Sequence, residues 1–201
     1  MPNLPALEVD VQLLKPRIVY HHDIDLFGLP TIQHGTEHPP PGATLFGLTK
    51  LVDNLRVEFR RVAIPLTDGR VCVWLTKVDA QLGDPTMDVY IAQNYPRDSC
   101  EYKVTLAHEN THVRFNLEAL RDWLPKIRAA VTEAAKRKFP ASFPAQPTAE
   151  EINKVLLDPV APVFHEMNED MGRRNASIDT PENYRREIAK CGNWMPHADP
   201  Q

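Results

Sequence analysis

The stretch that decides the fold is Val104-Thr-Leu-Ala-His-Glu-Asn-Thr-His-Val-Arg-Phe-Asn-Leu-Glu-Ala-Leu-Arg-Asp-Trp-Leu124. Its apolar residues recur at spacings of three and four, which is typical of an amphipathic helix. On a helical wheel, His108, Glu109, His112 and Asn116 fall inside the apolar arc. Polar side chains are buried at low cost only when they have partners. The helix is therefore predicted to bury these four polar side chains, and each of them needs a binding partner.

The residues His108-Glu-Asn-Thr-His112 match the pattern H-E-x-x-H. Positions i and i+4 lie about 40° apart on a helix, so both imidazoles project from one face and can bind a single Zn²⁺. Glu109 lies on the flank of that face, where it can act on a water as a general base. The alternative is that both histidines are core residues satisfied by the backbone or by Glu109.

The two halves of the chain differ in period. Residues 1–100 are strand-rich: Arg70–Ala80 and Thr86–Ala92 alternate apolar and polar residues, and a turn at residues 84–85 predicts that they form a hairpin. Leu55–Ile64 is a further candidate strand, linked to the first of these by a turn at residues 67–69. Residues 101–201 are helical and carry the motif. Together these patterns predict one compact α+β domain, with a small, mainly antiparallel sheet packed on the motif helix and a long C-terminal helical hairpin. The proline- and glycine-rich residues 30–43 are expected to be a loop.

A third metal ligand is expected from the returning arm of the helical hairpin. If the motif helix runs to about Lys138, with a kink or break at Pro125, and the chain reverses near Pro144, residue i faces about residue 288 − i. Asp179 then lies opposite the two histidines. Glu182 and His165 remain alternatives for this ligand. Tyr184, one turn from Asp179, is a candidate donor of a hydrogen bond to an oxyanion.

The same register brings Cys100 within reach of Cys191. We therefore predict a disulfide between them, which would clamp the base of the hairpin. The third cysteine, Cys72, lies in a predicted strand and is expected to stay a free thiol.

Composition restricts the partners. The chain has 201 residues and a formal net charge of −4. No basic cluster is long enough to predict nucleic-acid binding, and no apolar run is long enough to span a membrane. Met1–Asp10 has neither the basic nor the apolar region of a signal peptide.

The stretch Val89-Tyr-Ile-Ala-Gln-Asn-Tyr-Pro-Arg-Asp-Ser-Cys-Glu-Tyr-Lys-Val-Thr-Leu-Ala-His-Glu-Asn-Thr-His-Val113 resembles a bacterial family of zinc-dependent peptidases of unknown substrate. In that family a cysteine and an aromatic residue precede an H-E-x-x-H helix. The resemblance covers about residues 70–120, with a weaker echo at Ile178-Asp179-Thr180. It implies a zincin-like fold, a zinc cofactor and, because members are often exported, a periplasmic or secreted protein; a cytoplasmic location is the alternative.

The functional hypothesis is a zinc metallopeptidase that acts on a peptide or protein. His108, His112 and Asp179 would hold the metal, and Glu109 would be the general base, with Thr86–Ala92 as an edge strand that pairs with the extended substrate. The alternatives are a metal-stabilised interaction module without turnover and a helical-hairpin protein whose histidines are structural. The oligomeric state is not encoded in any pattern of the sequence.

Overall fold

The computed structural model describes residues 5–32, 45–192 and 194, and it has an α+β fold. The chain divides into two compact units, and each unit draws residues from both the strand-rich half and the helical half. The first unit comprises residues 1–15, 53–83 and 119–170; the second comprises residues 16–52, 84–118 and 171–201. Most of the loop predicted at residues 30–43 lies outside the described residues, and its first residues belong to the short helix α1 (Leu29–Ile32).

The first unit contains a mixed sheet in the order β1-β5-β4, with the short strand β7 also paired to β5. The strands are β1 (Glu8–Leu13), β4 (Leu55–Pro65), β5 (Val71–Leu82) and β7 (Ala141–Phe143). β1 is parallel to β5, whereas β4 and β7 are antiparallel to it. The two strands that the predicted turn at residues 67–69 links, β4 and β5, are thus antiparallel neighbours in this sheet. Alternate residues of β5 are buried, as the period-2 pattern indicated.

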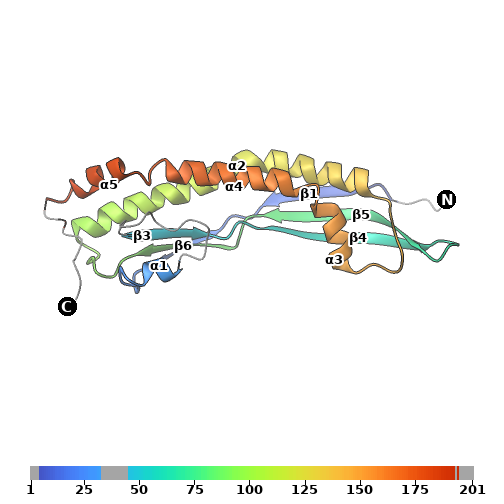
Figure 1. Cartoon of the computed structure of the whole chain (residues 1–201), viewed down its shortest axis with the longest axis horizontal. Coiled ribbons are helices and arrows are strands. Elements are labelled where there is room, and N and C mark those ends of the chain that lie inside the picture. The colour runs from blue at the N-terminus through green and yellow to red at the C-terminus, as the bar shows by residue number, and fades with distance from the viewer. Residues whose placement is uncertain (1–4, 33–44, 193, 195–201) are drawn as a thin grey trace. The chain divides into compact units, whose positions relative to one another are not determined.

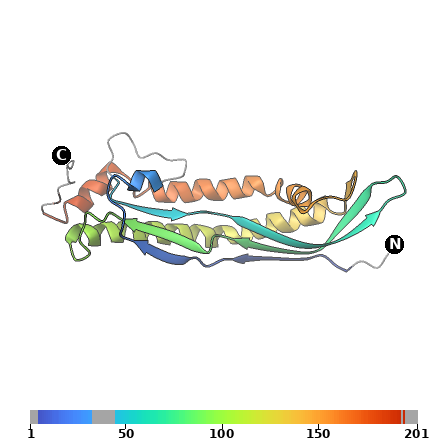
Figure 2. The same cartoon turned by 90° about the horizontal axis from the view of Figure 1, so that it is seen from below.

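The second unit contains a mixed three-stranded sheet in the order β2-β6-β3. Its strands are β2 (Arg17–His21), β3 (Gly47–Leu51) and β6 (Thr86–Ile91). β2 is parallel to the central strand β6, and β3 is antiparallel to it. The first half of α2 lies across one face of this sheet (Figures 1 and 2).

Two sequence predictions about the strands are wrong. The chain does not form one small, mainly antiparallel sheet, because each of its two sheets includes a parallel pair. β5 and β6 do not form a hairpin either, since they belong to different sheets. Gly83, whose φ of +110° favours glycine, lies between them. Its N–H donates to Asn54 O at 2.8 Å, and the chain continues into the second sheet instead of folding back.

The C-terminal helical hairpin is present. Its long arm is α2 (Cys100–Lys138), which continues through Pro125 without ending there. Buried side chains on both sides of the proline, Trp123 and Ile127, anchor the helix in the first unit and offset the hydrogen bond that proline cannot make. The returning chain forms α3 (Ala149–Leu157), α4 (Ala161–Ala176) and α5 (Pro181–Ile188).

The hairpin register agrees with the prediction to within a few residues in both units. In the first unit, Trp123 Nε1 donates to Asp170 Oδ2 at 3.0 Å. In the second unit, Cys100 and Cys191 form the predicted disulfide, with 5.7 Å between their Cα atoms. Cys72 is a free cysteine, as predicted.

No helix within the described ranges is long and apolar enough to cross a membrane.

Candidate metal centre

The motif helix buries the polar side chains that the wheel placed in its apolar arc. The exposed fraction is 6% for His108, 4% for Glu109, 8% for His112 and 3% for Asn116. These residues lie in the first half of α2, which packs on the aromatic and aliphatic core of the second unit. A helix that buries four polar side chains needs partners for each of them. The returning arm of the hairpin supplies partners for His108, His112 and Asn116, and strand β3 supplies one for Glu109.

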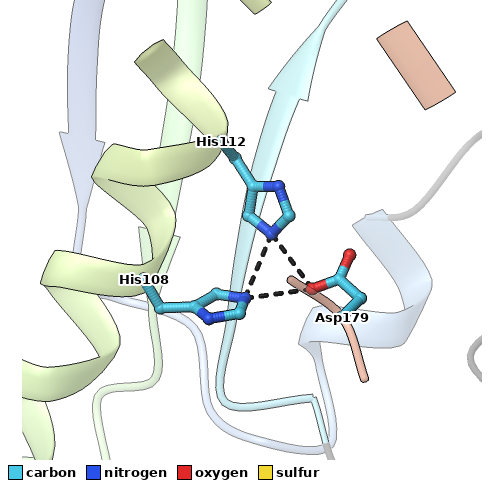
Figure 3. Close-up of side chains that lie close together, drawn as sticks. All are labelled: His108, His112 and Asp179. Carbon is cyan, nitrogen blue, oxygen red and sulfur yellow. Dashed lines mark hydrogen bonds and ion pairs between the residues drawn. The ribbon is translucent and has the colours of Figure 1, made fainter. Parts of the chain in front are cut away.

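Asp179 meets the two histidines at one point (Figure 3). Its Oδ1 lies 3.0 Å from His108 Nε2 and 3.1 Å from His112 Nε2, and the two Nε2 atoms are 3.1 Å apart. Asp179 occupies the turn between α4 and α5, just before Thr180. The Thr180 side chain caps α5 by accepting a hydrogen bond from Asn183 N at 3.1 Å. The hairpin register expected from the sequence therefore identified Asp179, the residue that contacts both histidines in the structure.

The outer nitrogen of each imidazole is already engaged. His108 Nδ1 lies 3.0 Å from Glu187 Oε2, and His112 Nδ1 lies 3.0 Å from Asn175 Oδ1. The Asn175 amide nitrogen donates to Asn116 Oδ1 at 2.8 Å, which leaves its oxygen to face His112. Both partners are acceptors, so each Nδ1 carries a proton and each Nε2 can present a lone pair to the centre of the cluster.

The donor set fits a metal cation. Two imidazole nitrogens and a carboxylate oxygen converge, and while both histidines are neutral at these nitrogens the three acceptors repel one another unless a cation or a proton lies between them. Their spacing is close to the separation of about 3.3 Å between ligands of a tetrahedral zinc ion with bonds of 2.0–2.1 Å. His108, His112 and Asp179 together form a group that could hold a metal.

The electrostatics of the metal-free chain show how strongly this point attracts positive charge. Burial opposes protonation of His112, but its hydrogen bond to Asp179 and the nearby charge of Glu109 outweigh burial and raise its pKa to about 9. Burial also works against ionisation of Asp179, yet hydrogen bonds from His108 and His112 hold its pKa well below the usual range. A metal ion bound by these side chains would take the place of the shared proton.

Glu109 lies beside this cluster, held by the edge strand β3. Thr49 Oγ1 donates to Glu109 Oε2 at 2.7 Å. Gly47 allows the strand to approach, because a Cβ at that position would lie only 2.6 Å from Glu109 Oε1. Burial raises the pKa of the Glu109 carboxyl, while His112 and His108 lower it. The carboxylate is therefore buried and oriented, but it does not belong to the metal-binding group.

Tyr184 also reaches the centre, from the middle of α5. Its hydroxyl donates to Asp179 Oδ1 at 2.9 Å, and its ring stacks on His108 with 5.2 Å between centroids. Burial and the charge of Asp179 raise the pKa of Tyr184, so the phenol keeps its proton at neutral pH. The hydroxyl remains available as a hydrogen-bond donor at the site.

The two alternative ligands lie elsewhere. Glu182 is exposed in the first turn of α5 and is not part of the cluster. His165 is 74% exposed on α4, where its Nε2 lies 3.4 Å from Glu169 Oε1. The prediction of Thr86–Ala92 as an edge strand is wrong, because β6 is the central strand of its sheet. The strand at the edge beside Glu109 is β3.

Sequence reasoning missed Glu187, Asn175 and Thr49, which orient the histidines and the glutamate. Glu187 and Asn175 lie on the returning arm, one or two turns from Asp179, among other charged and polar residues. A signal for Glu187 was the spacing of three and four residues that puts Asn183, Tyr184 and Glu187 on one face of α5.

Comparisons with protein-family models, with curated proteins and with solved structures find no significant match to this chain. The geometry of the site and the chemistry of its side chains therefore carry the functional conclusion.

Proposed function

We propose that this protein is a zinc-dependent peptidase with a zincin-like active site. The observation that carries the proposal is the convergence of three donor atoms, each within 3.1 Å of the other two, beside a buried glutamate that is held separately. His108, His112 and Asp179 would hold the metal. Catalytic zinc sites have three protein ligands and keep a further position open for a water or substrate, and these three residues would supply that number of ligands.

Bound zinc supplies Lewis acidity, which acidifies a water and polarises the scissile carbonyl. Glu109 takes the proton of the attacking water and passes it to the nitrogen of the leaving amine. Thr49 Oγ1 donates a hydrogen bond to Oε2 of that carboxylate at 2.7 Å, which leaves Oε1 to accept and release the proton. Tyr184 donates its hydroxyl hydrogen bond to the oxyanion that develops on the carbonyl, and for this the hydroxyl turns from Asp179 to the substrate.

An extended peptide would bind along β3. Among the described residues, no strand pairs with the second edge of β3, and Thr49 in this strand contacts Glu109. A peptide that adds to this edge would run past the general base with its main chain held by hydrogen bonds. The substrate class is therefore a peptide or a protein segment in extended conformation.

We further propose that the protein works in the periplasm or outside the cell. The disulfide between Cys100 and Cys191 supports this location, because structural disulfides persist in oxidising compartments and are rare in the cytosol.

The decisive experiment replaces Glu109 by glutamine. We expect the variant to keep one zinc per chain, measured by elemental analysis, and to lose at least about 100-fold in kcat/KM on an unbiased peptide library, in line with the loss of a general base. Glu118→Gln is the matched control, since Glu118 lies on the same helix with its side chain 46% exposed. Both proteins are compared at equal zinc content.

Other outcomes would select the alternative functions. If the parent binds zinc and hydrolyses no peptide, the chain is a metal-stabilised interaction module. If the parent binds no zinc, the histidines are structural, and the peptidase proposal is wrong.

A further inference from the structure

Asn116 is the one member of the buried polar face of α2 for which the proposed function has no role. It lies one turn beyond His112 on the same side of the helix, because residues four apart on a helix are neighbours. Asn116 is 3% exposed. A buried amide is costly unless it is hydrogen-bonded, so the contacts of Asn116 indicate what it does.

A short chain of hydrogen bonds connects Asn116 to the metal-binding group. The amide nitrogen Nδ2 of Asn175 donates to Asn116 Oδ1 at 2.8 Å, and Asn175 Oδ1 lies 3.0 Å from His112 Nδ1. On the far side of the same imidazole, Nε2 lies 3.1 Å from Asp179 Oδ1. An amide has donors at one end and an acceptor at the other, so the partner at one end determines which group the other end presents.

The orientation of the Asn175 amide decides which nitrogen of His112 carries the proton. With the amide oxygen toward Nδ1, a neutral imidazole keeps its proton on Nδ1 and has a lone pair on Nε2 for a metal. If the amide turned over, its NH2 group would face Nδ1 and the proton would move to Nε2. His112 could then bind no metal through the nitrogen that faces Asp179. The Asn116 oxygen opposes this change, because the turned amide would bring two oxygens together.

We propose that Asn116 is a positioning residue that acts through Asn175 to keep Nε2 of His112 free of a proton and available to the metal. The inference rests on the metal centre of the proposed function and adds to it a residue that touches no metal position. His108 needs no such residue, because its Nδ1 faces the Glu187 carboxylate at 3.0 Å, and an ionised carboxylate is an acceptor whichever way it lies. The two imidazoles are thus held in the same tautomer by different means, and only the amide needs a second residue to orient it.

The test compares the zinc affinities of Asn116 variants by competition with a chromophoric chelator at fixed pH. Asn116→Ala removes the acceptor and should weaken zinc binding by about tenfold, the lower end of the cost of disturbing the partner of a metal-binding histidine. Asn116→Asp can only accept a hydrogen bond, so it should bind zinc at least as tightly as the parent. Asn110→Ala is the matched control and should leave zinc affinity unaltered, because Asn110 is exposed on the same helix and accepts its hydrogen bond from Tyr20, at 2.7 Å, and not from a partner of a histidine.

A double-mutant cycle tests whether Asn116 acts through Asn175. A carboxylate at position 175 presents an acceptor to His112 in either orientation, so in an Asn175→Asp background the change Asn116→Ala should no longer lower zinc affinity. A loss of packing around residue 116 would lower the affinity in both backgrounds. If Asn116→Ala does not fold, nitrogen NMR of the zinc-loaded parent decides: it should find the metal on Nε2 of His112 and the proton on Nδ1, and the reverse would overturn the proposal.

The outcomes separate the positioning role from the proposed function. Unchanged zinc affinity in Asn116→Ala would overturn the role of Asn116. Equal losses in Asn116→Ala and Asn116→Asp would also overturn it, because they would show that packing matters and the acceptor does not. A parent that binds zinc and hydrolyses no peptide would refute the peptidase function alone, since the zinc affinities still decide the role of Asn116. A parent that binds no zinc would refute both.

Discussion

Replacing Glu187 by alanine is the sharpest test of how the metal centre is built. Glu187 touches no proposed metal position; it accepts a hydrogen bond from His108 Nδ1 at 3.0 Å, with its own side chain 15% exposed. Its removal leaves the Nδ1–H of a buried ring without a partner. His108 can then shift its proton to Nε2, which removes the lone pair that would bind zinc.

The expected loss follows from these contacts. Leaving a buried donor unpaired costs about 1–3 kcal/mol, and damage to the partner of a metal-binding histidine costs about 10- to 100-fold in metal affinity. We therefore expect Glu187→Ala to weaken zinc binding by about 10- to 100-fold. Glu187→Gln keeps an acceptor without the charge, and because charge-assisted hydrogen bonds are about twice as strong as neutral ones, it should lose only about fivefold.

The assay is competition for zinc with a chromophoric chelator at fixed pH, with Glu182→Ala, an exposed change on the same helix, as the control. Unfolding of the metal-free proteins reports any general loss of stability, and the visible spectrum of the cobalt-substituted proteins reports the coordination geometry. Zinc affinity equal to that of the parent in Glu187→Ala would refute the idea that Glu187 orients His108. Equal losses in the alanine and glutamine variants would show that the negative charge matters and the hydrogen bond does not.

Three further predictions follow from the same geometry. Asp179→Ala should reduce zinc affinity by tenfold or more while Glu182→Ala leaves it unchanged; the reverse order, measured with the same chelator, would mean that the third ligand is misassigned. Tyr184→Phe should keep its zinc and lose about 100- to 1000-fold in kcat, the usual cost of one oxyanion donor, and an unchanged kcat would remove Tyr184 from the mechanism. Replacing Cys100 and Cys191 by serine opens a cross-link with a sequence separation of 91; urea denaturation should show a loss of up to about 4–5 kcal/mol in the free energy of unfolding, and a negligible loss would contradict the entropic account of this bond.

Part of the site could be predicted from the sequence because its determinants are local or nearly so. The positions of His108, Glu109 and His112 on one buried helix face depend only on the helical period. The nomination of Asp179 and the pairing of Cys100 with Cys191 required one further assumption, an antiparallel return of the helix. In such a return, the residues that face each other follow from the number of residues on each side of the turn. The structure places Asp179 opposite His108, and Cys191 opposite Cys100, within a few residues of this expected register.

The sheets could not be predicted in the same way, because strand pairing is not a local property. β1 and β2 are short and mostly solvent-accessible, with Val11 the one fully buried residue of β1, so their alternation is weak. Each pairs in parallel with a strand about 70 residues further along the chain. Nothing in a period-2 pattern specifies the partner of a strand, and the apparent hairpin at Gly83 was in fact the crossing from one sheet to the other.

The sequence by itself therefore determined the motif helix, its buried polar face and the residue opposite it, since backbone geometry and residue spacing are enough for these. Only the tertiary structure decided that Glu187 and Asn175 fix the two imidazoles and that Thr49 holds Glu109. These roles depend on which polar side chains are desolvated next to one another. A charged residue on an amphipathic helix has the same appearance in a sequence whether it faces water or a buried histidine.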